Sequence, residues 1–191
     1  VTSICLRIAR NHEGCASSVL PALMDNNRIR GALLCGEPSS GKTSLLRDIA
    51  NQLSAGNRGR RCRVAVIDER GELSYGNTLK NCDVLLYSPK GAGIQQAVRC
   101  LAPDVVIFDE LGTMEETQAV MAGLNAGVAV ITSAHGRNLA DLQRRPPVAA
   151  ALHTGAFERV VLLEGRLHPG VAAQVISMED IPAAPRSAAS L

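Results

Sequence analysis

The sequence is poor in aromatic residues, which make up 2% of its 191 residues, with no Trp, two Tyr and two Phe. This scarcity argues against the aromatic stacking platforms with which single-strand nucleic-acid binders hold bases. The sequence also lacks a large excess of charge of one sign, because its 20 Lys+Arg are nearly balanced by 18 Asp+Glu and the net charge is +2. Binding to nucleic acid or to an anionic membrane needs a concentrated basic field, so both features argue against a nucleic-acid partner.

The six cysteines include no pair at the two-residue spacing of zinc knuckles or redox motifs. We therefore expect reduced thiols in a cytoplasmic protein. No apolar run approaches the roughly 18 residues that would cross a bilayer, and no basic, apolar leader opens the sequence. We expect neither a membrane span nor an export signal, and the first residue, Val1, leads us to expect a piece of a longer protein.

Short apolar runs alternate with helical stretches from residue 31 onward. The runs are Ala32–Cys35, Val64–Ile67, Val84–Tyr87, Val105–Phe108, Val128–Ile131 and Val160–Leu163. Continuous apolar runs suit strands that are buried on both faces of a parallel sheet. The stretches between them have the helical period, and the core-facing positions are Leu45, Leu46, Ile49 and Leu53 in one helix and Ile94, Ala97, Val98 and Leu101 in another. A third helix is expected over 115–126. This alternation predicts an α/β fold, a mainly parallel sheet flanked by helices on both faces.

A complete phosphate-binding motif, G-E-P-S-S-G-K-T, follows the first run and precedes a helix, as the chemistry requires. Gly36 and Gly41 allow backbone angles and a close approach that a Cβ would block, so that the amides of residues 39–43 can point at phosphate oxygens. Lys42 is expected to bridge the β- and γ-phosphates, and the Thr43 hydroxyl to bind Mg²⁺. The predicted nucleotide contacts are Gly36, Glu37, Pro38, Ser39, Ser40, Gly41, Lys42, Thr43 and Ser44.

Two carboxylates, Asp109 and Glu110, end the apolar run Val105–Phe108. A buried strand would place Asp109 at the sheet edge to hold Mg²⁺, and Glu110 beside it could polarise a water for attack on the γ-phosphate. The Asn-Lys-x-Asp signature of guanine binding is absent, which favours ATP. The alternative is that Glu110 merely caps the next helix.

Two further strand ends carry polar residues. His135 follows Val128–Ile131 and could sense the γ-phosphate or orient water; a lone His is more often structural. The segment Asp68–Glu72 follows Val64–Ile67 and could extend the Mg²⁺ and water network, with Glu69 as a catalytic candidate. The alternative for this segment is a solvated loop with local ion pairs.

Arginines crowd the loop before the strand at Val64. Ring ATPases place an arginine against a neighbouring subunit's γ-phosphate. The candidates for such a residue are Arg58, Arg60, Arg61 and Arg63, with Arg99, Arg144, Arg145 and Arg159 in competition. The alternative is a basic solvated loop.

Together, these segments resemble the ATPase domain of the stage III sporulation protein AA family, a relative of the type II/IV secretion ATPases in the additional-strand, catalytic-glutamate class. The stretches that carry the resemblance are 7–10, 14–16, Gly36–Thr43 with Leu45–Ala50, Asp68–Glu72, Pro103–Val106 leading to Asp109–Gly112, Leu124–Val128 and His135-Gly136. Ser39-Ser40 departs from the Gly-Cys or similar pair that relatives often carry.

This resemblance implies a RecA-like, magnesium-dependent ATPase that acts at a membrane as a homo-hexamer and powers a channel between mother cell and forespore. In the wider secretion family, the segment corresponding to Asp68–Glu72 is the acidic box and Thr132–Gly136 is the histidine box. The implied division is 1–30 as a remnant strand and helix of an N-terminal domain, 31–181 as the ATPase domain, and 182–191 as a loose tail. ATP/ADP, other copies of the chain and membrane-embedded channel components are the implied partners.

The function expected is hydrolysis of ATP to ADP and phosphate, with Lys42 and the loop amides on the phosphates, Thr43 and Asp109 on Mg²⁺, and Glu110 as the base. Two alternatives stay open. One is an ATP-gated assembly module with little turnover. The other is a nucleic-acid-stimulated motor that uses the loop Arg58–Arg63.

Overall fold

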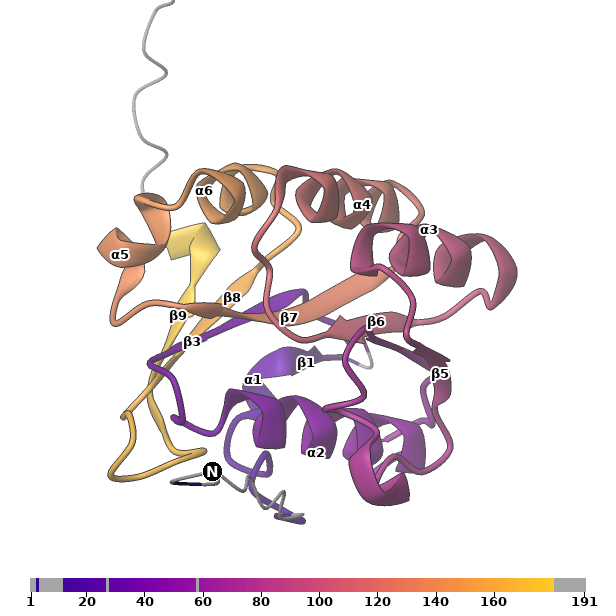
Figure 1. Ribbon diagram of the computed structural model, residues 1–191, viewed down its shortest axis with the longest axis horizontal. Coiled ribbons are helices and arrows are strands. Elements are labelled where there is room, and N and C mark those ends of the chain that lie inside the picture. The colour runs from indigo at the N-terminus through magenta and orange to yellow at the C-terminus, as the bar shows by residue number, and fades with distance from the viewer. Residues whose placement is uncertain (1–2, 4–11, 27, 58, 181–191) are drawn as a thin grey trace, which may run out of the picture.

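The computed structural model describes residues 3, 12–26, 28–57 and 59–180. In this part of the chain, a seven-stranded sheet forms the centre of the molecule (Figure 1). The strands, in the order in which they lie in the sheet, are β5 (Asp83–Leu86), β4 (Val64–Asp68), β6 (Val105–Phe108), β7 (Ala129–His135), β3 (Ala32–Gly36), β8 (Arg159–Leu163) and β9 (Ala172–Ser177). Neighbours are parallel from β5 to β8, and β9 runs antiparallel to β8. The α/β class and the mainly parallel sheet are confirmed.

Helices cover both faces of the sheet (Figure 1). One face carries α1 (Leu20–Leu23) and α2 (Lys42–Ala55), and the other carries α3 (Lys90–Cys100), α4 (Met114–Asn125), α5 (Leu139–Gln143) and α6 (Pro146–His153). Alternate residues of the central strands point to the two faces. In β3, Leu34 packs in the core under α2, whereas Leu33 packs in the core under α3, α4 and α6. This arrangement explains why the central strands are continuously apolar.

The four predicted core positions of α2 are all buried. In α3, Ile94 and Ala97 are fully buried. Val98 and Leu101 are only half-buried, and Leu101 lies one residue past the helix. The helix expected over 115–126 is present as α4.

The run Val84–Tyr87 differs from the expectation of a strand buried on both faces. It forms β5 at the edge of the sheet, where Leu86 is 45% exposed and Tyr87 is 73% exposed. Tyr87 has φ +56° and follows the last residue of the strand. An apolar run of this length does not distinguish a central strand from an edge strand, because the distinction depends on which strand follows in the sheet.

From the sequence, the alternation of Ile4, Leu6 and Ile8 predicts a half-buried strand, and Cys15–Met24 is expected to form a short helix that Pro21 kinks or restarts. The segment before β3 contains less helix than this expectation. Residues 13–19 form turns, and α1 begins only at Leu20, with Pro21 in its first turn, where the missing N–H of proline costs nothing. A two-stranded ribbon, β1 (Met24–Asp25) with β2 (Arg28–Ile29), follows it and was not predicted. The strand expected around Ile4, Leu6 and Ile8, the residue Arg58 and the tail 182–191 lie outside the described residues.

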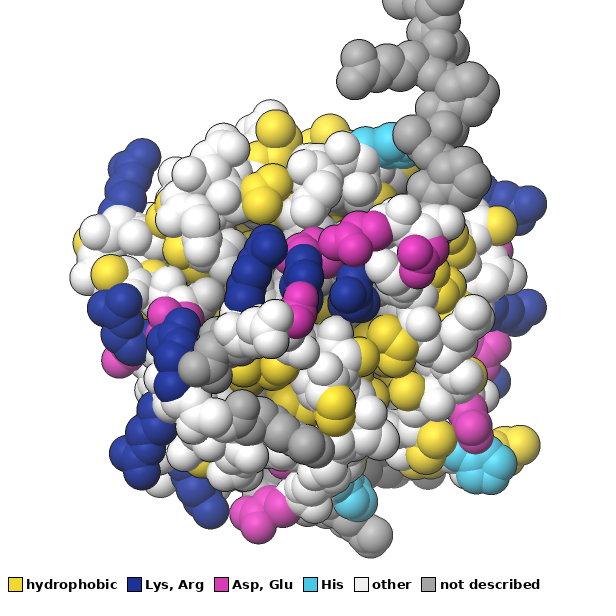
Figure 2. Space-filling model, turned by 180° about the vertical axis from the view of Figure 1, so that it is seen from behind, with side chains coloured by type: hydrophobic (Ala, Val, Ile, Leu, Met, Phe, Trp, Pro, Cys, Tyr) yellow, Lys and Arg dark blue, Asp and Glu magenta, His cyan; other side chains and the backbone are white. Residues whose placement is uncertain are grey.

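The surface opposite the view of Figure 1 carries charges of both signs. Figure 2 shows basic and acidic side chains lying side by side across the middle of this face. Among the described residues, ion pairs join Arg28 with Glu158, Arg30 with Asp25 and Glu158, and Arg60 with Asp104. These basic residues are therefore paired with carboxylates and do not form a field of one sign.

Candidate nucleotide-binding site

The phosphate-binding motif forms the turn between β3, which ends at Gly36, and α2, which begins at Lys42. Gly41 is the N-cap of α2 with φ +90°, a conformation that favours glycine. A Cβ at this position would lie 2.3 Å from the amide nitrogen of Gly170. Gly170 in turn donates a hydrogen bond of 2.8 Å to the carbonyl of Ser40. The motif is thus packed closely against the loop that joins β8 to β9.

Lys42 is buried, with 7% of its surface exposed. Its ammonium group donates to the backbone carbonyls of Gly36, at 2.9 Å, and Glu37, at 2.8 Å. Burial lowers the pKa of Lys42, and the nearby carboxylates of Asp109 and Glu110 act in the opposite direction. The ammonium group of the lysine is therefore held in place by backbone carbonyls of the phosphate-binding loop.

Asp109 joins three elements at the carboxyl edge of the sheet. The hydroxyl of Thr43, in the first turn of α2, donates to Asp109 Oδ2 at 2.7 Å. The hydroxyl of Ser133, in β7, donates to Asp109 Oδ1 at 2.5 Å. A hydroxyl and a carboxylate oxygen therefore lie together at the end of the phosphate loop, and hard oxygen donors of this kind are the ones that Mg²⁺ prefers.

Glu110 adopts the left-handed backbone conformation, with φ +55°. Its N–H donates to Ser133 Oγ at 3.1 Å, and its carbonyl accepts from Lys90 Nζ at 2.6 Å. The carboxylate is 44% exposed and faces the cavity described below. The alternative that Glu110 caps the next helix is wrong. Thr113 is the N-cap of α4 and forms a capping box with Glu116.

His135 lies between the lysine and the glutamate. Its Nδ1 is 3.3 Å from Lys42 Nζ, and its Nε2 is 3.4 Å from Glu110 Oε1. An ammonium group can only donate, so Nδ1 accepts and the ring proton is on Nε2, toward the carboxylate. The imidazole thus connects the phosphate loop with the residue after Asp109.

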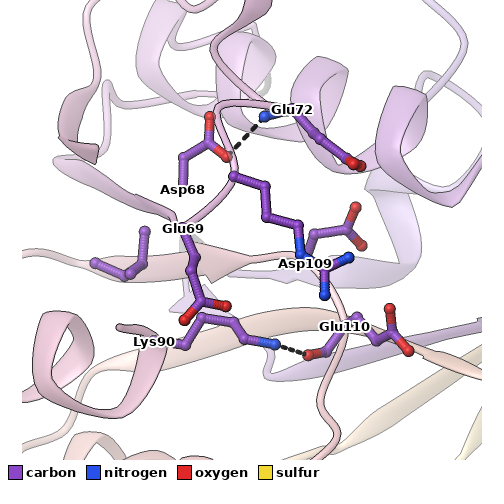
Figure 3. A pocket seen from close by; sticks show the side chains of 8 residues that line it. Asp68, Glu69, Glu72, Lys90, Asp109 and Glu110 are labelled. Atoms are coloured by element: carbon purple, nitrogen blue, oxygen red, sulfur yellow. Dashed lines mark hydrogen bonds between the residues drawn. The ribbon is translucent and has the colours of Figure 1, made fainter. Parts of the chain in front are cut away.

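The segment Asp68–Glu72 is divided between two roles. Asp68 is buried and accepts hydrogen bonds from the Glu72 and Ser74 amides and from the Ser74 hydroxyl, so it shapes the loop after β4. Glu69 is exposed and lines a small cavity of about 40 Å³ together with Lys90, Asp109 and Glu110. In Figure 3 its side chain points toward Lys90. Its expected catalytic role stays a prediction.

A larger cavity of about 720 Å³ opens over the phosphate loop. Its volume is within the range of roughly 300–1,000 Å³ that is typical of small-molecule sites. Its lining includes Ser39, Lys42, Thr43, Asp109, Glu110 and His135. The sequence-predicted side chains from three different strand ends thus share one cavity.

The arginine cluster of the loop before β4 lies elsewhere. Asp104, which precedes β6, pairs with Arg60 at 3.1 Å and accepts from the Arg63 amide at 2.7 Å. These residues are at the amino ends of the strands, on the edge opposite the phosphate loop. Arg137 and Arg166, which the sequence did not single out, are the arginines that pair with Glu37 of the motif, at 3.0 and 3.9 Å.

Two contributors to the site were not predicted, Ser133 and Lys90. Ser133 had a partial signal, because a hydroxyl or imidazole was expected at the end of β7, although His135 was preferred. Lys90 had no signal, since it is the first residue of a surface helix, where a lysine is ordinarily solvated.

The strand order, the glycine loop between β3 and α2, and the acidic end of β6 define a phosphate-loop protein with the fold of the secretion and pilus ATPases. The family model described as "Sporulation stage III, protein AA" matches residues 1–180. The chain belongs to this family.

A curated relative, stage III sporulation protein AA of Bacillus subtilis (strain 168), is 36% identical over 186 residues. The alignment covers 92% of this chain and 59% of the relative, so the chain spans less than two thirds of the relative's length.

Among solved structures, the Legionella pneumophila ATPase DotB superposes with a TM-score of 0.62 at 18% identity, covering 82% of this chain and 48% of that one. The Brucella suis VirB11 ATPase of a type IV secretion system has a TM-score of 0.60 at 17% identity, covering 85% and 50%. These likenesses establish the fold. In the part of the chain that the structure describes, no helix is both long and apolar enough to cross a membrane.

Proposed function

We propose that this chain is the catalytic core of a magnesium-dependent ATPase of the secretion type, which hydrolyses ATP to ADP and phosphate. The observation that carries the proposal is the convergence of Lys42, Thr43, Asp109 and Glu110 on one cavity. The hydrogen bond of 2.7 Å between Thr43 and Asp109 links the phosphate loop to the acidic strand end.

The binding roles follow from the donors and acceptors of the loop. Lys42 and the amides of residues 39–43 supply positive charge and N–H groups for the phosphate oxygens. Thr43 and Asp109 would hold Mg²⁺, which binds to phosphate-containing sites through one or two protein oxygens and keeps water for the rest. The bound ion would neutralise charge on the β- and γ-phosphates. Among the described residues, no group of three or more His, Cys, Asp and Glu side chains could hold a metal ion.

Glu110 is proposed as the general base. Its partly exposed carboxylate lines the same cavity as Lys42, so it can accept a proton from a water placed in line with the γ-phosphate. The water oxygen bonds to the γ-phosphorus, the bond to the oxygen bridging to the β-phosphate breaks, and ADP leaves. His135 would transmit the occupancy of the γ-phosphate position between Lys42 and Glu110, because it lies between both groups.

Assembly and cellular role are proposed from the family. Membership in the stage III sporulation protein AA family and the fold of secretion ATPases support a cytoplasmic protein that forms a homo-hexamer at a membrane. In this proposal the hexamer drives assembly of, or transport through, a sporulation channel complex. An arginine acting in trans would come from a neighbouring copy. Arg60 and Arg63 lie on the sheet edge opposite the phosphate loop of their own chain and could face the site only in this way.

The test is steady-state hydrolysis of Mg-ATP by the wild type and by Glu110→Gln, with binding of a fluorescent ADP analogue measured on both. Glu110→Gln should bind as the wild type does and hydrolyse about 10²–10⁴-fold more slowly, which is the usual contribution of a general base. Glu115→Gln, on the adjacent helix α4, is the matched control and should hydrolyse normally. Normal turnover by Glu110→Gln would refute the base assignment. A wild type that binds ATP and assembles without turnover would refute hydrolysis and favour the ATP-gated assembly module.

A further inference from the structure

Lys90 and Glu116 form an ion pair next to the candidate site. Lys90 Nζ is 2.9 Å from Glu116 Oε1, and the side chains are 14% and 8% exposed. The other oxygen of Glu116 accepts from the amides of Gly112 and Thr113, at 2.7 and 3.1 Å, and so closes the capping box of α4. The pair thus connects the first residue of α3 with the turn between β6 and α4.

The same ammonium group donates to the carbonyl of Glu110 at 2.6 Å, the contact drawn in Figure 3. Two contacts with β7 hold the other side of this residue. The Glu110 amide donates to Ser133 Oγ, and the Leu111 amide donates to the Ser133 carbonyl at 2.8 Å. The main chain at Glu110 is therefore held on both sides by side chains and backbone of distant elements.

This fixation has a physical reason. A residue with a Cβ is strained in the left-handed region, and such a conformation persists only where the surroundings determine it. Glu110 has φ +55°. In an extended backbone, its side chain would point in a different direction from the side chain of Asp109. The strained turn aims the Glu110 carboxylate at His135 and at the cavity over Lys42.

We infer that Lys90, anchored by Glu116, is a positioning residue that holds Glu110 in the left-handed conformation in which its carboxylate can serve the reaction. The inference rests on the proposed function, in which Glu110 is the base. Lys90 itself lines only the small cavity beside Glu69 and not the larger cavity over the phosphate loop. Its substitution should therefore change turnover and leave nucleotide affinity unchanged.

The experiment compares kcat and KM for Mg-ATP in the wild type, Lys90→Met, Glu110→Gln and the double variant. Lys80→Met, which changes an exposed lysine, is the control. Lys90→Met should lose kcat on the order of 10²-fold, the cost of a displaced catalytic group, with KM nearly unchanged. In the Glu110→Gln background the same substitution should cause no further loss, because the group that it positions is already gone. A wild-type kcat, or an equal loss in both backgrounds, would overturn the inference.

A crystal structure of Lys90→Met gives a readout that needs no activity. Residue 110 should leave the left-handed region in this variant, and retention of a positive φ would overturn the inference whatever the kinetics. A wild type without ATPase activity would instead refute the proposed function, so the two failures are distinguishable. If Lys90→Met does not fold, Glu116→Gln keeps an oxygen for the Gly112 and Thr113 amides and removes the charge that anchors Lys90. It should lower kcat without changing KM, and a wild-type kcat would overturn the inference.

Discussion

The two edges of the sheet hold their charged side chains in different ways. At the amino edge, Asp104 with Arg60 and Glu158 with Arg30 neutralise one another in ion pairs. At the carboxyl edge, the ammonium group of Lys42 is bonded to backbone carbonyls and to an imidazole, and the carboxylate of Asp109 bonds to two hydroxyls. Charges paired with each other are already neutralised, whereas charges held by backbone and hydroxyl groups keep their capacity to meet a ligand. Only the second arrangement leaves charged groups ready to meet a ligand within the same chain.

The largest expected effect at the carboxyl edge comes from Lys42→Ala. Hydrogen bonds to charged groups are each worth about 1.5–3 kcal/mol, so loss of the ammonium group should weaken ATP binding on the order of 10²-fold and abolish turnover. Titration with a fluorescent ATP analogue measures the change in Kd. Lys80→Ala removes an exposed lysine and should bind as the wild type does. If Lys42→Ala retains the wild-type Kd, the phosphates are not bound at this loop.

A second effect, in stability, should distinguish the strained backbone at Glu110 from a position at the amino edge that has no positive φ. Alanine is ordinarily more stable than glycine within an ordered element by roughly 0.5–1 kcal/mol. At Glu110, with φ +55°, the order should reverse, and Glu110→Gly should be more stable than Glu110→Ala by about 1 kcal/mol. Urea unfolding of both variants gives the difference in the free energy of unfolding.

The matched pair for this comparison is Glu158→Gly and Glu158→Ala at the amino edge. Glu158 does not have a positive φ. There the alanine variant should be the more stable one. The same order at both positions would mean that the backbone at Glu110 carries no strain in solution.

Much of the carboxyl edge could be predicted because its signals are local in the sequence. The phosphate loop depends on glycines within one turn, and Asp109 and Glu110 directly follow a buried apolar run. The parallel sheet then brings the ends of separate strands to one edge, which is why His135 could be placed near Lys42 from its position after an apolar run alone. Their catalytic roles stay predictions.

The features that were not predicted depend on how elements distant in the sequence are placed beside one another, which a local sequence pattern does not encode. Lys90 contacts Glu110 only because α3 begins beside the turn after β6. The edge strand β9 lacks a continuous apolar run. Its residues are half-buried or exposed, and the strand is held by its pairing with β8. The apolar run of β5 resembles that of a central strand, although no strand follows it in the described sheet.

The smallest expected effect belongs to the amino edge. Burial alone would raise the pKa of Asp104. Hydrogen bonds from the Arg60 side chain and the Arg63 amide, together with the positive charges of both arginines, outweigh this effect and lower the pKa below its ordinary value of 3.8. The ionised carboxylate therefore stabilises the fold above about pH 4, and this contribution is lost as the pH falls through the lowered pKa. Asp104→Asn should cost between about 0.5 and 1 kcal/mol at pH 7, in the range of partly exposed ion pairs, and less in acid.

Urea unfolding of wild type and Asp104→Asn at pH 7 and pH 3 measures this difference. Asp83→Asn, which changes an exposed carboxylate of β5, serves as the control and should show no such pH dependence. ATP turnover of Asp104→Asn at pH 7 should equal that of the wild type, because Asp104 does not line the cavity over the phosphate loop of its own chain. A large loss of turnover with little change in stability would instead place Asp104 and its arginines in the catalytic cycle, as expected if a neighbouring copy presents this edge to the phosphate loop.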